Sequence, residues 1–281
     1  MTLFGDYMKI CIIGNGKRHE ILERNLSRLG YETQHITSAS DIKESISAEY
    51  IVLPIPTLTK DSKVNLPGYP NDKSIEDLFS TSNFKKAITC NYISNNYDTV
   101  DINQRDDFAY LNAVPTAEGA IHAAVENCEY SLFYGKILIT GFGRVAKILS
   151  DRLKGLKCNV TIAARSLKDL SYAKALGFNT ININKLSECI HSYDTIFQTV
   201  PVMVLDRNIL NLVNPQTVII ELSSKSAGTD YDYAEKLGVK IVHAPALPER
   251  VAPVTAGNIL TECVLSIITE DNNPRLNGRK K

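Results

Sequence analysis

The chain has 281 residues, of which 44% are hydrophobic and 22% charged, a balance typical of a globular protein long enough for two domains. Lys plus Arg and Asp plus Glu each number 31, so no net charge attracts nucleic acid or an anionic membrane. No apolar run reaches the length of a membrane span, and no signal-peptide layout is visible. Six scattered cysteines lack metal-ligand spacing. We therefore expect a cytoplasmic protein with reduced thiols and no metal site.

The first half of the chain alternates strand and helix patterns. Strand patterns occur at residues 9–14, 50–53 and 87–92, and a helical period occurs at residues 18–29. Four prolines between residues 54 and 71 predict irregular surface chain near the strand ends, where a ligand loop could lie. We predict an N-terminal α/β substrate domain over residues 1–114.

A helix is predicted to join the halves at residues 115–130, with Pro115 in its first turn. A last helix, residues 256–270, is expected to pack back on the first domain and complete it. This two-domain arrangement predicts a cleft between the halves, which is a common place for a small-molecule site.

The second half repeats the alternation more regularly. Strands are predicted at residues 136–141, 159–163, 194–200, 217–222 and 240–244, and helices at residues 144–156, 167–176 and 230–237. Parallel neighbours need helical crossovers, so this order specifies a parallel sheet. The predicted fold is α/β, with two doubly wound parallel-sheet domains, of which the second, residues 131–255, is an NAD(P)-binding Rossmann domain.

A glycine-rich turn at Gly141-Phe142-Gly143-Arg144-Val145-Ala146 joins the first strand and helix of that domain. Gly141 permits a tight turn, Gly143 lets a pyrophosphate approach the backbone, and Ala146 keeps the helix close to the sheet. The amino terminus of the helix offers N–H groups and a positive dipole end to the phosphates. The turn therefore predicts a dinucleotide cofactor.

The end of the next strand indicates which dinucleotide is bound. An NAD-selective domain carries an acid there, whereas this chain has Arg165-Ser166, a cation and a hydroxyl suited to a 2′-phosphate. NADP is therefore the predicted cofactor, and Thr199-Val200-Pro201 is predicted to lie beside its nicotinamide. Glu221, one strand later, fits equally a catalytic acid and a strand-terminal acid bonded to nearby N–H groups.

Five motifs of the chain resemble those of the family formed by the A subunits of dipicolinate synthase. They are Pro115-Thr116-Ala117-Glu118-Gly119, Gly141-Phe142-Gly143-Arg144, Ala163-Ala164-Arg165-Ser166, Gly228-Thr229-Asp230 and Val251-Ala252-Pro253-Val254-Thr255-Ala256-Gly257. The resemblance implies an NADP-linked oxidation of a dihydrodipicolinate-type precursor to dipicolinate in the mother cell of a sporulating bacterium, on a branch of the diaminopimelate/lysine pathway. It also implies a flavoprotein-like second subunit, the B subunit, as partner, beside a possible homo-oligomer.

Such a substrate is a small cyclic dicarboxylate, which needs cations or hydrogen-bond donors and a group that takes a ring proton. Candidates for binding the carboxylates follow the strands of the first half: Lys17, Arg18, Thr57, Asn91 and Ser94. Lys17 and Arg18 fit ordinary surface charges equally well.

Proton transfer is assigned to Glu118, with Thr116 beside it and His122 one helical turn later. Glu118 fits equally a first-turn acid stabilised by the helix dipole, and a lone helical His is more often structural.

Two other functions stay open. One is an NADP-dependent 2-hydroxy-acid-type dehydrogenase that uses His243 and Arg250, and the other is a non-catalytic NADP-binding subunit.

Overall fold

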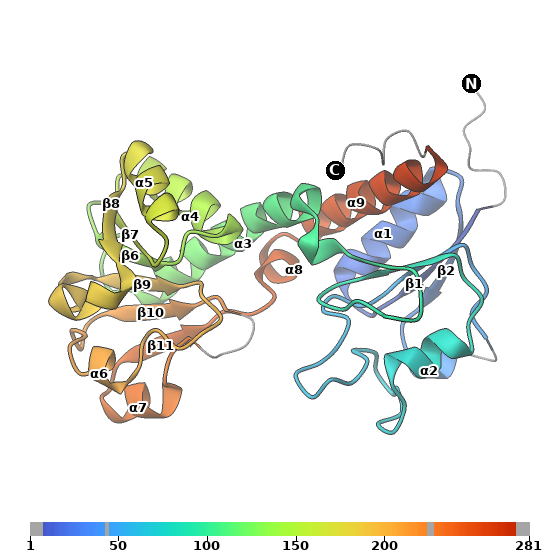
Figure 1. Ribbon diagram of the computed structural model, residues 1–281, viewed down its shortest axis with the longest axis horizontal. Helices are drawn as coiled ribbons and strands as arrows, with labels where there is room; N and C mark the ends of the chain where they lie inside the picture. The colour runs from blue at the N-terminus through green and yellow to red at the C-terminus, as the bar shows by residue number, and fades with distance from the viewer. Residues whose placement is uncertain (1–7, 43–44, 224–227, 274–281) are drawn as a thin grey trace. The chain divides into compact units, whose positions relative to one another are not determined.

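The computed structural model describes residues 8–42, 45–223 and 228–273 (Figure 1). The chain forms two compact units: unit 1 comprises Met1–Asn112 with Ala252–Lys281, and unit 2 comprises Ala113–Val251. Within the described ranges, every helix is too short or too polar to cross a lipid bilayer.

Unit 1 contains a five-stranded sheet in the order β2-β1-β3-β4-β5, with all neighbours parallel. Its strands are β1 (Lys9–Ile13), β2 (Glu32–Ile36), β3 (Tyr50–Val52), β4 (Lys86–Thr89) and β5 (Thr99–Asp101). The chain order reverses between β1 and β3, so the loops after these two strands border the crevice where such sheets bind ligands.

Successive residues of the unit 1 strands face opposite sides of the sheet, as the two-residue period of a strand requires. Ile10 and Ile12 pack with α1 (Lys17–Arg28) and α9 (Pro253–Asn272), whereas Cys11 and Ile13 pack with α2 (Ile75–Ser80). Helices α1 and α9 therefore lie side by side on one face (Figure 1). Residues 54–71 are irregular, as the prolines predict.

Unit 2 contains a six-stranded parallel sheet in the order β11-β10-β9-β6-β7-β8. Its strands are β6 (Lys136–Thr140), β7 (Asn159–Ala164), β8 (Asn179–Asn182), β9 (Thr195–Gln198), β10 (Val218–Glu221) and β11 (Lys240–His243). Counted from the first strand of the unit, this is the strand order of dinucleotide-binding Rossmann sheets, with its reversal between β6 and β9. The predicted fold class is confirmed.

The two faces of the unit 2 sheet are covered by different helices. Ile137 and Ile139 of β6 pack in one cluster with α3 (Asp106–Asn127), α4 (Arg144–Gly155) and α5 (Leu167–Ala175). Leu138 faces the other cluster, which includes α6 (Arg207–Leu210) and α7 (Tyr231–Lys236). A short helix, α8 (Leu247–Val251), follows β11. Figure 1 shows this layering.

Helix α3 differs from the helix predicted at residues 115–130. It begins at Asp106 and ends at Asn127, so Pro115 lies inside it and not in its first turn. A proline interrupts only the hydrogen bond to the residue four positions earlier, and the two acids Asp106 and Asp107 supply the favourable first-turn charge instead. The boundary between the two units therefore falls within α3, after Asn112.

Candidate active site

The glycine-rich turn of unit 2 has the conformation that a phosphate-binding turn needs. Gly141 has a φ of +82°, and an added Cβ would lie 2.9 Å from Val200 Cγ2, so only glycine fits without strain. Gly143 caps α4, and no described heavy atom lies within 4 Å of the position its Cβ would take. A diphosphate can therefore reach the backbone N–H groups at the start of α4.

Other residues of the turn anchor it. The Phe142 side chain is buried and packs against the rings of Tyr172 and Phe178, with centroids 6.1 and 6.4 Å away. Phe142 can therefore contribute only its backbone to a cofactor site. Arg144 and Val145 are half-buried in the first turn of α4.

The predicted ribose selector directly follows β7. Arg165 is exposed, and Ser166 is the amino-terminal cap of α5. The Ser166 Oγ accepts a hydrogen bond from the Asp169 N–H at 3.3 Å, so its own proton can be donated to a ligand. A cation and a hydroxyl donor are thus placed together at a helix amino terminus, where a phosphate is favoured.

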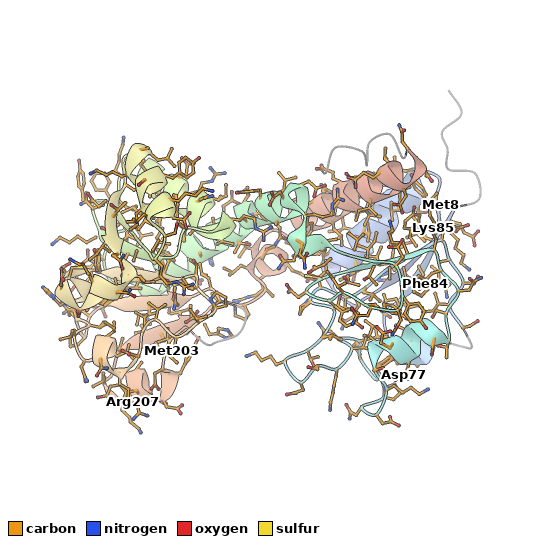
Figure 2. The ribbon with its side chains drawn as sticks, viewed as in Figure 1. Met8, Asp77, Phe84, Lys85, Met203 and Arg207 are labelled. Carbon is orange, nitrogen blue, oxygen red and sulfur yellow. The ribbon has the colours of Figure 1, made fainter. Side chains whose placement is uncertain are left out.

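The loop after β9 is held against the glycine turn. The Thr199 hydroxyl donates to Thr140 O at 2.6 Å, and the Thr199 N–H donates to Thr140 Oγ1 at 3.2 Å. Pro201 is exposed, and the loop continues through exposed Met203 (Figure 2). Thr199 and Val200 therefore lie at the strand-order reversal, next to Gly141.

A buried polar network beneath this edge was not predicted from the sequence. Thr140, Gln198 and Glu221 end three neighbouring strands at the same level, and all are fully buried. The Glu221 carboxylate accepts from the Thr229 hydroxyl at 2.8 Å and from the Ser223 N–H at 3.2 Å. These bonds favour a structural role for Glu221. The sequence does contain a signal for this network, because each of the three buried strands ends in a polar residue.

In unit 1, the loops after β1, β3 and β4 bring most of the predicted substrate residues to one edge of the sheet. Arg18 in the first turn of α1 is only 4% exposed, although its residue type is usually exposed. Lys17 is exposed and paired with Glu20 at 2.6 Å within its own helix. Of the two cations, Arg18 is therefore the one that the fold encloses.

The polar candidates after β3 and β4 also stabilise their own loops. Thr57 Oγ1 accepts from the Cys90 N–H at 2.7 Å, which joins the two loops. Ser94 Oγ accepts from the N–H groups of Asn96 and Tyr97. Asn91 has a φ of 61°, and its N–H donates to the buried carboxylate of Asp101 at 2.9 Å. Thr57 has an O–H proton still to donate, but its side chain is fully buried between the two loops.

His19 is buried beside the same turn. Its ring lies against Gly14, where an added Cβ would be 2.9 Å from ring atoms, and its Nε2 is 3.4 Å from Leu53 O. Burial is the main cause that lowers the pKa of His19 from 6.5 to about 4.

The lowered pKa predicts a pH-dependent stability of unit 1. The unfolded chain binds the His19 proton below about pH 6.5 and the folded chain only below about pH 4, so stability falls as pH drops through this window, by about 3 kcal/mol in total. His19→Phe keeps a ring over Gly14 and should flatten this dependence in urea unfolding followed by circular dichroism. The exposed His122 provides the control, because His122→Phe should leave the dependence unchanged. An equally steep dependence in His19→Phe would contradict the assignment.

The predicted catalytic residues Thr116, Glu118 and His122 lie on α3 within unit 2. Because α3 begins at Asp106, Glu118 is in the helix interior, and the alternative of a dipole-stabilised first-turn acid is wrong. His122 Nδ1 lies 3.4 Å from Glu126 Oε2, and both side chains are exposed. The structure thus pairs His122 with Glu126, one turn after it, and not with Glu118, one turn before it.

The residues of the alternative dehydrogenase site lie on separate elements. His243 ends β11 with its ring 6.3 Å from that of Tyr231, and Arg250 is on α8. In the part of the chain that the structure describes, no three His, Cys, Asp or Glu side chains are grouped to hold a metal ion.

The chain is similar to two solved structures over most of its length. The dipicolinate synthase A subunit from Bacillus halodurans is 25% identical, with a TM-score of 0.81 over 92% of this chain and 97% of that one. Its counterpart from Bacillus subtilis is 26% identical, with a TM-score of 0.79 over 96% and 97%. Over most of its length the chain is therefore similar to the family of dipicolinate synthase A subunits.

A curated member of the family shows closer identity over a shorter stretch. The dipicolinate synthase A subunit of Bacillus subtilis (strain 168) is 34% identical over 171 residues, which are 61% of this chain and 58% of that protein. The aligned part therefore spans less than two thirds of this relative. No family model matches the chain. An NADPH-dependent glyoxylate/hydroxypyruvate reductase from Sinorhizobium meliloti, 13% identical with a TM-score of 0.56 over 96% of each chain, shares the fold.

Proposed function

We propose that the chain is the NADP-dependent oxidoreductase subunit that forms dipicolinate from a dihydrodipicolinate-type precursor. The observation that carries the proposal is the glycine turn at the strand-order reversal of a Rossmann sheet, in a chain that is similar to solved dipicolinate synthase A subunits over most of its length. Its relatives are named as one subunit of a synthase, so the proposal includes a partner, the flavoprotein-like B subunit.

Unit 2 carries the residues that we propose bind the cofactor. The N–H groups after Gly143 would hold the pyrophosphate, because they begin α4 and, apart from the two chain neighbours of Gly143, no described heavy atom lies within 4 Å of the position that a Cβ at Gly143 would take. Arg165 and Ser166 would hold the 2′-phosphate, and Thr199-Val200-Pro201 would flank the nicotinamide end. When bound, the nicotinamide supplies the acceptor for one hydride from the substrate ring.

Unit 1 carries the residues that we propose bind the substrate. The guanidinium of the enclosed Arg18 can bind a carboxylate by two parallel hydrogen bonds, and the Thr57 hydroxyl at the neighbouring loop can donate another. The exposed Lys17, next to Arg18 in the chain, adds attraction for a dianion, although it is already paired with Glu20. Asn91 and Ser94 hold the loop after β4 in place and complete the polar edge.

Oxidation of the dihydro ring removes one hydride and one proton and leaves an aromatic pyridine. The proton needs an acceptor, and we assign it to the Glu118 carboxylate, which is exposed on α3. The half-buried Thr116, two positions earlier, lies on a different side of the helix and is left without a direct role in this step. His122, which pairs with Glu126, is left with a structural role on the helix surface. Because aromatisation favours product, a modest base is sufficient.

Turnover tests the proposal. The purified chain, alone and with the B subunit, is incubated with NADP⁺ and the dihydro precursor, and NADPH and dipicolinate are quantified separately. We expect equal amounts of both products, and turnover by the chain alone would exclude a non-catalytic NADP-binding subunit. Absence of NADPH formation in both preparations would contradict the proposal, as would oxidation of a 2-hydroxy acid in place of the dihydro precursor.

The same assay tests the substrate side. Arg18→Met should raise KM for the precursor by about tenfold to a hundredfold and leave KM for NADP⁺ unchanged, because a charge-assisted hydrogen bond of about 1.5–3 kcal/mol is lost. Arg24→Met is the matched control, since Arg24 is an exposed cation on the same helix. An unchanged KM for the precursor in Arg18→Met would remove Arg18 from the site.

A further inference from the structure

Gln198 is the centre of the buried network at the cofactor edge of unit 2. It ends β9, is fully buried, and lies in register with Thr140 on one side and Glu221 on the other. Its Oε1 accepts from the Thr140 hydroxyl and from the Val200 N–H, the latter at 3.2 Å. Its Nε2 donates to Gly228 O at 2.9 Å. Both ends of the amide are therefore used.

These bonds join three segments that are distant in sequence. Thr140 directly precedes Gly141 of the glycine turn, and Val200 belongs to the loop that packs on Gly141. Gly228 O also accepts from the N–H groups of Val204 and Leu205, so it ties the same loop farther along, between Met203 and Arg207 in Figure 2. One side chain thus connects the phosphate turn, the loop after β9 and the segment at Gly228.

The surroundings of Gln198 are specific for its amide. A Cβ added to Gly228 would lie 2.3 Å from Gln198 Nε2, so the close approach of the two segments requires glycine there. A buried amide costs free energy unless it is hydrogen-bonded, and an apolar side chain would fill the same space without that cost. A carboxylate could accept the same bonds but could not donate to Gly228 O. The side chain of Gln198 therefore orients the segments that it is hydrogen-bonded to, and does more than fill space in the core.

We propose that Gln198 is a positioning residue that fixes Thr199 and Val200 relative to the phosphate turn, and thereby holds the nicotinamide end of the cofactor at the edge of β9. This inference rests on the proposed NADP site. Gln198 itself is enclosed and touches neither substrate nor cofactor. Gln198 acts through the backbone of Thr199 and Val200, the loop residues that would contact the cofactor.

The test compares whole cofactor with a fragment of it in calorimetric titrations. Adenosine 2′,5′-bisphosphate carries the 2′-phosphate and lacks the nicotinamide. Gln198→Met should weaken NADPH binding about tenfold, by loss of the oriented loop, and leave binding of the fragment unchanged. Gly228→Ala should displace the Gln198 amide without removing it. It should likewise weaken NADPH binding and leave binding of the fragment unchanged. The matched control is Thr217→Val. This change removes a buried hydrogen bond from the Thr217 hydroxyl to Tyr193 O at the amino-terminal end of β10, away from the cofactor, and should change neither affinity.

Each outcome is decisive. A parallel loss of NADPH and fragment binding, or a lower melting temperature with both affinities intact, would show that Gln198 is only structural. If Gln198→Met does not fold, Gln198→Glu decides, because its carboxylate retains the acceptor but replaces the bond to Gly228 O by repulsion between two oxygens. Equal NADPH binding in Gln198→Glu and wild type would overturn the inference. Wild-type protein that binds neither ligand would instead reject the proposed cofactor site itself.

Discussion

Replacing Arg165 with alanine is expected to weaken NADPH binding by about tenfold to a hundredfold and to leave NADH binding unchanged. The two cofactors differ only by the 2′-phosphate, and a charge-assisted hydrogen bond to it contributes about 1.5–3 kcal/mol. Arg165 is exposed at the end of β7, so its removal should not disturb the core. Fluorescence titration of both reduced cofactors measures the ratio directly.

Arg152→Ala is the control for Arg165→Ala. Arg152 is an exposed cation near the other end of α4, where it pairs with Asp151, so its loss changes the net charge equally without touching the cofactor edge. The assignment of NADP fails if Arg165→Ala weakens both cofactors to the same extent, or if the wild type prefers NADH.

Gly257→Val is expected to destabilise unit 1 by about 3 kcal/mol, which corresponds to a fall in melting temperature of roughly 10 °C. Gly257 lies where α9 crosses α1, and an added Cβ would lie 2.5 Å from the Cβ and Cγ2 atoms of Ile21. The two helices would have to separate, because Ile21 is itself enclosed. Since Arg18 O lies 3.1 Å from the same position, substrate binding should weaken as well.

Thr255→Val places the same side chain on the same helix at an exposed position and should change stability by no more than about 0.5 kcal/mol. Thermal unfolding followed by circular dichroism compares the two variants. Equal melting temperatures would mean that the α1–α9 contact tolerates a larger side chain and that Gly257 has another role.

The strands that were not predicted from the sequence all lie at sheet edges, although one edge strand, β11, was predicted. Central strands such as β1 and β6 are buried on both faces and appear as apolar runs. The strands β2, β5 and β8 lie at sheet edges, are only partly buried, and consist of mixed residues such as Glu32-Thr33-Gln34-His35-Ile36. Their pairing comes from the neighbouring strand, and no local pattern shows it.

Some residues of the candidate site could be predicted from the sequence and others could not. The glycine turn and Arg165-Ser166 are local signals, because each function belongs to a few consecutive residues. The bond from Gln198 to Gly228 joins residues 30 positions apart, and only the folded sheet brings them together. The helix start at Asp106 was hidden by Pro115, which looks like a first-turn residue and lies in the helix interior.

A crystal structure of the protein with NADPH and dipicolinate both bound would test the proposed cofactor residues and the proposed substrate residues in one experiment. We expect the pyrophosphate at the N–H groups after Gly143, the 2′-phosphate against Arg165 and Ser166, and a carboxylate of the product against Arg18. A cofactor whose 2′-phosphate lies away from Arg165, or a product bound without contact to Arg18, would contradict the proposed site.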